Sequence, residues 1–94
     1  MPWAVTDVHN QLTYFREKGE LRTADAFKKC VRRAFILLEE SALQYQIVDE
    51  PMRRCPLEPF RHGVIYEIEG ELVVIHAVAH ARQKPRDWHA RSRK

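Results

Sequence analysis

Two runs of apolar, largely β-branched residues flank the pair Glu69-Gly70, and they constrain the fold of this chain more than any other feature. The runs cover residues 64–68 and 72–79. Glycine at the end of a two-residue connection adopts positive φ readily, so the pattern predicts a tight β-hairpin. Moving the two-residue loop from 69–70 to 70–71 leaves the same residues together on each face.

Side chains alternate along a strand, which divides the predicted hairpin into two faces. The first face is apolar and carries Val64, Tyr66, Ile68, Val73, Ile75, Ala77 and Ala79. The second is mixed and carries Arg61, Ile65, Glu67, Leu72, Val74, His76, Val78 and His80. Antiparallel sheets commonly pack one face and solvate the other. We therefore expect helices on the first face and functional side chains on the second.

Two amphipathic segments precede the hairpin. Residues 4–18 carry apolar side chains at helical spacing and are followed by Gly19, which favours a helix end there. Residues 23–43 carry a stronger stripe at the i, i+3, i+4 and i+7 positions. Because the connection is short, we expect an antiparallel helical hairpin that covers the apolar face of the sheet.

The remaining elements are shorter. Residues 44–51 are predicted to form a loop, and residues 52–58 a third strand. Pro56 has no amide donor, which favours a sheet edge or a bulge. Pro85 favours a short terminal helix over residues 86–91, with Trp88 as its anchor.

The predicted fold is α+β, in the order α-α-β-β-β with a short C-terminal helix. A single domain, residues 1–94, contains the helical hairpin (2–43), the antiparallel sheet (52–80) and a basic segment (81–94). No apolar run approaches the roughly 20 residues of a membrane span. The N-terminus has neither the basic region nor the apolar core of a signal peptide, so we expect a cytoplasmic protein.

Charge is unevenly placed along the chain. The formal net charge is +3, yet residues 81–94 hold six basic side chains and one acidic side chain. This segment predicts an acidic partner, either nucleic acid or an acidic protein segment. The two cysteines, Cys30 and Cys55, do not have the paired spacing of a metal site, and we expect neither metal nor cofactor.

An ordered set of short motifs resembles the RelE/ParE toxin superfamily, specifically its ParE-like branch, over nearly the whole chain. These motifs are Tyr14-Phe15, Arg53-Arg54 with Phe60, Val64-Ile65-Tyr66 with Glu69-Gly70, and the run from Ala77 to Arg82 with Pro85 and Trp88. The resemblance implies a toxin of a type II toxin–antitoxin system with a cognate antitoxin. ParE-like toxins characteristically poison DNA gyrase without known catalysis, whereas RelE-like relatives cleave messenger RNA on the ribosome.

The chain departs from the family pattern in two places. Family members usually begin with a β-strand before the first helix. Only about five residues stand there in this chain, which is too few for a normal strand. In ribonuclease-type relatives a basic residue near the position of Gly63 helps to hold the scissile phosphate, which glycine cannot do. The missing first strand motivates a third reading, a degenerate or truncated relative that has lost toxicity, and a homodimer is left open.

The candidate site residues follow from these readings. For binding a target or antitoxin they are Arg53, Arg54, Arg61, His80, Arg82, Lys84, Arg86 and Trp88. For RNA cleavage, which needs a base, an acid and cations around the phosphate, they are His80, Arg82, Arg61 and His62. We expect His76, in the middle of its strand, to be a half-buried sheet residue.

Overall fold

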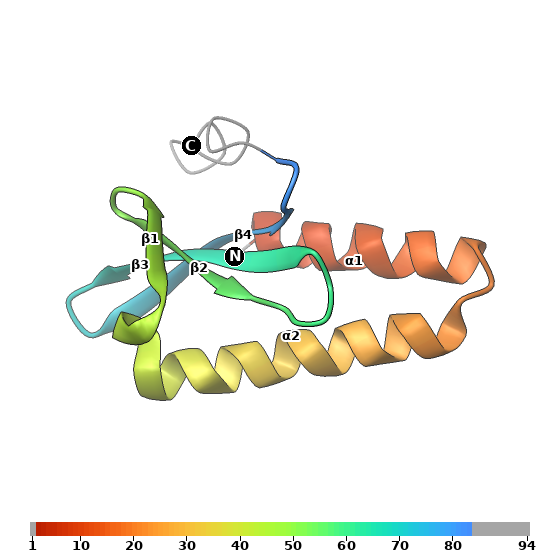
Figure 1. Ribbon diagram of the computed structural model, residues 1–94, viewed down its shortest axis with the longest axis horizontal. Coiled ribbons are helices and arrows are strands. Elements are labelled where there is room, and N and C mark those ends of the chain that lie inside the picture. The colour runs from red at the N-terminus through yellow and green to blue at the C-terminus, as the bar shows by residue number, and fades with distance from the viewer. Residues whose placement is uncertain (1, 84–94) are drawn as a thin grey trace.

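Two helices lead the chain into its sheet. The computed structural model describes residues 2–83. Helix α1 (Pro2–Glu17) and helix α2 (Leu21–Ser41) run in opposite directions and form the predicted hairpin (Figure 1). Gly19 lies between them with φ of 74°. A single 3-10 turn, η1 (Ala42–Gln44), follows α2.

The sheet has four strands in the order β1-β2-β3-β4, each antiparallel to its neighbour. They are β1 (Gln46–Asp49), β2 (Met52–Pro56), β3 (His62–Glu69) and β4 (Leu72–His80). The predicted α+β fold is confirmed, while the predicted loop over 44–51 is wrong because it contains β1. This edge strand is short, and three of its four side chains are exposed, so it shows no alternating apolar pattern.

The segment after β4 is only partly described. The short terminal helix predicted over residues 86–91 lies outside the described residues, as do Lys84, Arg86 and Trp88. No helix among the described residues is long and apolar enough to cross a membrane.

The predicted hairpin is present as β3 and β4, with its loop at the second of the two predicted positions. Glu69 pairs with Leu72, and Gly70 in the turn has φ of 63°. Farther along, Ile65 lies opposite Ala77 but Tyr66 lies opposite Ile75. His76 is therefore an extra residue, a β-bulge in β4.

This bulge corrects the predicted division of the two faces. Side chains of the turn half face the helices as expected, and Tyr66 and Val64 are fully buried in the main core. Beyond the bulge the alternation in β4 is inverted, so Val78 joins that core. Ala77 and Ala79, predicted to lie under the helices, instead form a separate buried cluster with Met52 and Ile65.

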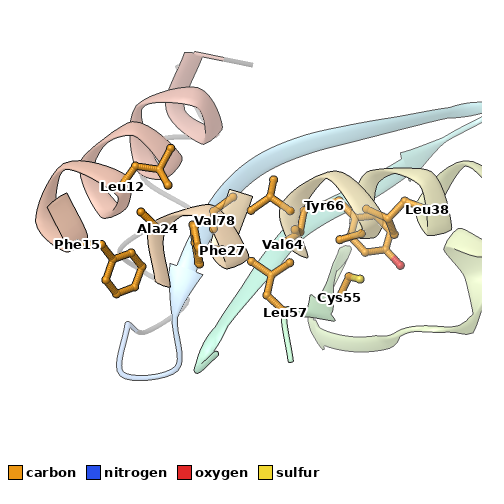
Figure 2. Close-up of a cluster of buried hydrophobic side chains, with 12 residues drawn as sticks. Leu12, Phe15, Ala24, Phe27, Leu38, Cys55, Leu57, Val64, Tyr66 and Val78 are labelled. Carbon is orange, nitrogen blue, oxygen red and sulfur yellow. The ribbon is translucent and has the colours of Figure 1, made fainter. Parts of the chain in front are cut away.

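The main core lies between the helical hairpin and the sheet. Figure 2 shows side chains from α1, α2 and the strands pointing toward one another, with Phe27 and Tyr66 among them. The rings of Phe15 and Phe60 contact Phe27, with centroids 5.8 and 5.1 Å from it. The Tyr66 hydroxyl donates to the carbonyl oxygen of Ala42, which ties the sheet to the end of α2.

No strand precedes α1 among the described residues, and α1 itself lies against β4. The Oδ2 atom of Asp7 accepts a hydrogen bond from the backbone amide of Val78 at 2.9 Å. A side-chain carboxylate thus satisfies an edge-strand amide that a neighbouring strand would otherwise pair. The position of α1 beside the sheet depends on this contact as well as on apolar packing.

The core predicts a large difference between two phenylalanines of α2. Phe27→Ala removes a ring with no exposed surface, and we expect the free energy of unfolding to fall by roughly 3–5 kcal/mol. Phe35→Ala is the matched control, because that ring is 37% exposed and should lose less than about half as much. Urea unfolding followed by circular dichroism measures both, and equal losses would contradict the described packing.

Candidate functional site

A cavity of about 580 Å³ lies between α1 and the end of the sheet where β3 begins and β4 ends. Its walls combine aromatic rings, amides and charged groups. They are formed by Asp7, Asn10, Gln11, Tyr14, Phe15, Phe60, Arg61, His62, Val78, His80 and Gln83. This is the place where the described residues concentrate hydrogen-bonding groups beside aromatic surface.

Helix α1 supplies one wall through a polar stripe. Asp7, Asn10, Gln11 and Tyr14 recur at helical spacing, so they project from one side of the helix. The neighbouring apolar stripe, which includes Phe15, packs into the core. Docking the apolar stripe therefore turns the polar stripe toward the ends of β3 and β4.

His62 and His80 form the opposite wall. They pair directly across β3 and β4, and their ring centroids lie 5.0 Å apart in an edge-to-face arrangement. His62 is buried against the Phe27 ring, and its Nε2–H donates to Oε1 of Gln11 at 3.0 Å. Its Nδ1 atom has no hydrogen-bond partner among the described residues.

The backbone after β4 fixes the orientation of the His80 ring. The Nδ1 atom of His80 accepts a hydrogen bond from the backbone amide of Arg82 at 3.0 Å. Gln83 Oε1 accepts one from the backbone amide of His80 at 2.9 Å. Because Nδ1 is an acceptor in this arrangement, the neutral ring carries its proton on Nε2.

Burial lowers the pKa of His62 to about 4, and the nearby positive charges of protonated His80 and Arg54 act in the same direction. The charged form of a buried imidazole is disfavoured because it has lost its hydration. At neutral pH His62 is therefore an uncharged ring. It can position neighbours and offer aromatic surface, but it is too weakly basic to hold a proton for transfer.

The structure brings together three of the predicted residues in a different combination from the expected one. Arg61, His62 and His80 line the same cavity, and Arg61 is exposed at its rim. The predicted grouping of Arg61, His76 and His80 on the face away from the helices is wrong, because the bulge places His80 on the side of α1. His76 is buried, and its Nε2 atom lies 2.8 Å from Oε1 of Glu67.

The two neighbouring arginines of β2 differ in what they contact. Arg53 Nη1 donates to the carbonyl oxygens of Tyr45, at 2.7 Å, and Leu43, at 3.3 Å. Its guanidinium therefore holds the connection between α2 and β1. Arg54 lies over Gly63, where an added Cβ would come within 2.5 Å of the Arg54 Nε atom. Glycine at position 63 is thus what allows Arg54 to cross the sheet.

Sequence reasoning missed the contribution of α1. Asp7, Asn10 and Gln11 were not among the candidates, nor was Gln83. The signal was present as polar residues at helical spacing beside the apolar stripe. The sequence did not indicate which strand end would face them, because that depends on the bulge. No group of residues able to hold a metal ion is found within the described part of the chain.

A family model described as ParE toxin of type II toxin-antitoxin system, parDE, matches residues 2–85. The chain belongs to the ParE toxin family. Searches of curated proteins and of solved structures found no match. The match covers both helices and all four strands, including every residue that lines the cavity. As a member of the ParE family the chain is a type II toxin, and such a toxin has a cognate antitoxin as its partner.

The lowered pKa of His62 predicts a pH-dependent stability of this ParE-family toxin. The unfolded chain binds a proton at His62 below its ordinary pKa of 6.5, whereas the folded chain binds it only near 4. The contribution of neutral His62 to the free energy of unfolding is therefore fully present above pH 6.5. It is lost as the pH is lowered toward 4, by about 3 kcal/mol in total.

Urea unfolding at a series of pH values checks this prediction. His62→Gln keeps a side chain that can donate to Gln11 and should flatten the profile over that window by about the same 3 kcal/mol. His9→Gln, at an exposed position of α1, is the control and should leave the profile unchanged. Parallel profiles for the parent chain and His62→Gln would exclude His62 as the cause.

Proposed function

We propose that this ParE-family toxin inhibits growth by binding DNA gyrase, and that its cognate antitoxin neutralises it. The family match supports this reading, because DNA gyrase is the target characteristic of the ParE-like toxins that the chain resembles. The proposed action is binding rather than catalysis. The protein would hold an acidic surface of its target through exposed basic side chains.

One observation carries the proposed binding surface. The amide of Ala81 donates to the carbonyl oxygen of Arg61 at 2.7 Å, which holds the residues before β3 and after β4 side by side. Arg61 and Arg82, both exposed, thus flank the same end of the sheet. In sequence the basic segment continues through Lys84 and Arg86. Arginine suits this role because its planar guanidinium pairs with carboxylate or phosphate in a bidentate manner.

The surface predicts that two arginines determine toxicity. We expect Arg61→Gln with Arg82→Gln to relieve growth inhibition on induction, and to raise at least about 10-fold the concentration of toxin that inhibits supercoiling by purified gyrase. Arg32→Gln with Arg33→Gln removes the same charge from exposed positions of α2 and is the matched control. Circular dichroism confirms that both double variants are folded. If the control loses as much inhibition as the test pair, the sheet end is not the binding surface.

Ribosome-dependent cleavage of messenger RNA is the second candidate, and it is favoured by the meeting of Arg61 with two histidines in one cavity. In that reaction His80 would serve as base or acid, and Arg61 would hold the phosphate. Primer extension on messages from induced cells separates the two readings, since cleavage within codons accompanies only the second. Normal growth on strong induction would instead favour the non-toxic relative.

A further inference from the structure

Several acceptor atoms of the cavity wall are already used by the protein, while donors beside them remain available to a ligand. Oε1 of Gln11, Oε1 of Gln83 and Oδ2 of Asp7 already accept hydrogen bonds from the protein, as does Nδ1 of His80. The side-chain amide N–H groups of both glutamines and the Nε2–H of His80 donate to no other described residue, and Arg61 adds its guanidinium. A ligand that fits this wall is rich in acceptors.

Aromatic surface accompanies these donors. The Tyr14 ring is 51% exposed, and Phe60, which also lines the cavity, is half-buried. Tyr14 stands on α1 and Phe60 on the loop before β3, so the two rings come from different walls. Flat aromatic groups such as nucleobases stack on exposed rings of this kind, with little dependence on base identity.

The charge of the cavity favours a nucleotide over an acidic peptide as its ligand. Among the described residues that line it, Arg61 is the fixed cation, Asp7 contributes a carboxylate, and His62 is neutral because it is buried. A strongly acidic segment would find little net positive charge within these walls, because the exposed Arg82 beside Arg61 is not among the residues that line the cavity. A ligand with an uncharged aromatic body and one anionic group matches the walls better. The volume of about 580 Å³ lies within the usual range of small-molecule sites.

We propose that the cavity between α1 and the ends of β3 and β4 binds a nucleoside monophosphate. Its base lies against Tyr14 and Phe60, its acceptors face the glutamine amides and His80, and its phosphate pairs with Arg61. The nucleotide can be free or can be one unit of a single strand. This site goes beyond the proposed binding of gyrase, and gyrase inhibition can fail while nucleotide binding persists.

Proton NMR of the full chain tests the site directly. The Hε1 signals of the histidines are followed while a 5′-mononucleotide of each base, or a tetranucleotide of the same base, is added up to about 5 mM, the range that detects millimolar dissociation constants. We expect saturable shifts at His62 and His80. His9 on the exposed surface of α1 and His76, bonded to Glu67, should not move.

Two variants assign the parts of the ligand. Arg61→Gln should weaken a nucleoside monophosphate roughly 10-fold or more and leave the matching nucleoside unchanged, since a charge-assisted hydrogen bond is lost. Tyr14→Leu should weaken nucleotide and nucleoside alike. Arg33→Gln on α2 is the control for loss of charge, and unchanged His9 and His76 signals show that each variant is folded.

The outcomes decide whether the site exists and whether its ligand is a free nucleotide or part of a single strand. Equal affinity for mononucleotide and tetranucleotide assigns a free nucleotide, and tighter binding of the tetranucleotide assigns a single strand. The proposal is overturned if neither produces saturable shifts at His62 and His80, or if Arg61→Gln and Tyr14→Leu bind as the parent chain does. It is also overturned if an acidic peptide shifts these histidines and no nucleotide does.

Discussion

The extra residue in β4, His76, determines which side chains of the sheet end meet α1. A strand places successive side chains on opposite sides, so one inserted residue inverts every position that follows it. Without the bulge, Val78 and His80 would face away from the helices, and Ala77 and Ala79 would lie beneath them. With it, Val78 joins the main core and His80 contacts His62 at the cavity. The candidate site therefore exists because of a local irregularity in the hairpin.

The bulge is itself held by an interaction that gives His76 a defined place. Its Nε2 atom and Oε1 of Glu67 lie 2.8 Å apart, and both side chains have little exposed surface. Burying a polar group without a partner costs free energy, so the Glu67 carboxylate compensates in part for the position into which the bulge puts this ring, whose Nδ1 atom has no partner among the described residues. The same inversion brings the Val78 amide to Asp7 of α1. Bulge, helix position and cavity wall are thus linked through neighbouring residues of one strand.

Sequence reasoning predicted the elements in which apolar residues recur at regular spacing. It failed where that spacing is interrupted. The stripe of α2 and the turn at Gly70 identified the helical hairpin and the central β-hairpin, because burial repeats along them. Strand β1 was missed since Ile47 and Val48 are both about 40% exposed at the sheet edge. His76 looks like any mid-strand residue, and nothing local distinguishes a bulge there from continued alternation.

The candidate site was predictable only in part for the same reason. Arg61, His62 and His80 were identified by residue type, but their common cavity depends on the bulge and on α1. Arg53 was chosen as a binding residue because of its charge alone. Its guanidinium instead donates to backbone carbonyls of the α2–β1 connection. A charged side chain indicates function only once its partners within the fold are known.

The position of His62 has a consequence for the choice between binding and catalysis. A residue that transfers protons near neutral pH needs a pKa close to that pH, whereas burial holds the pKa of His62 at about 4. It packs against the His80 ring in an edge-to-face arrangement and its Nε2–H is bonded to Gln11, so it acts as a support for the groups around it. That leaves His80 as the one cavity histidine with an orientation suited to direct contact with a ligand. One oriented donor beside an arginine, the exposed Tyr14 ring and the half-buried Phe60 ring is an arrangement better suited to recognition than to paired acid–base chemistry.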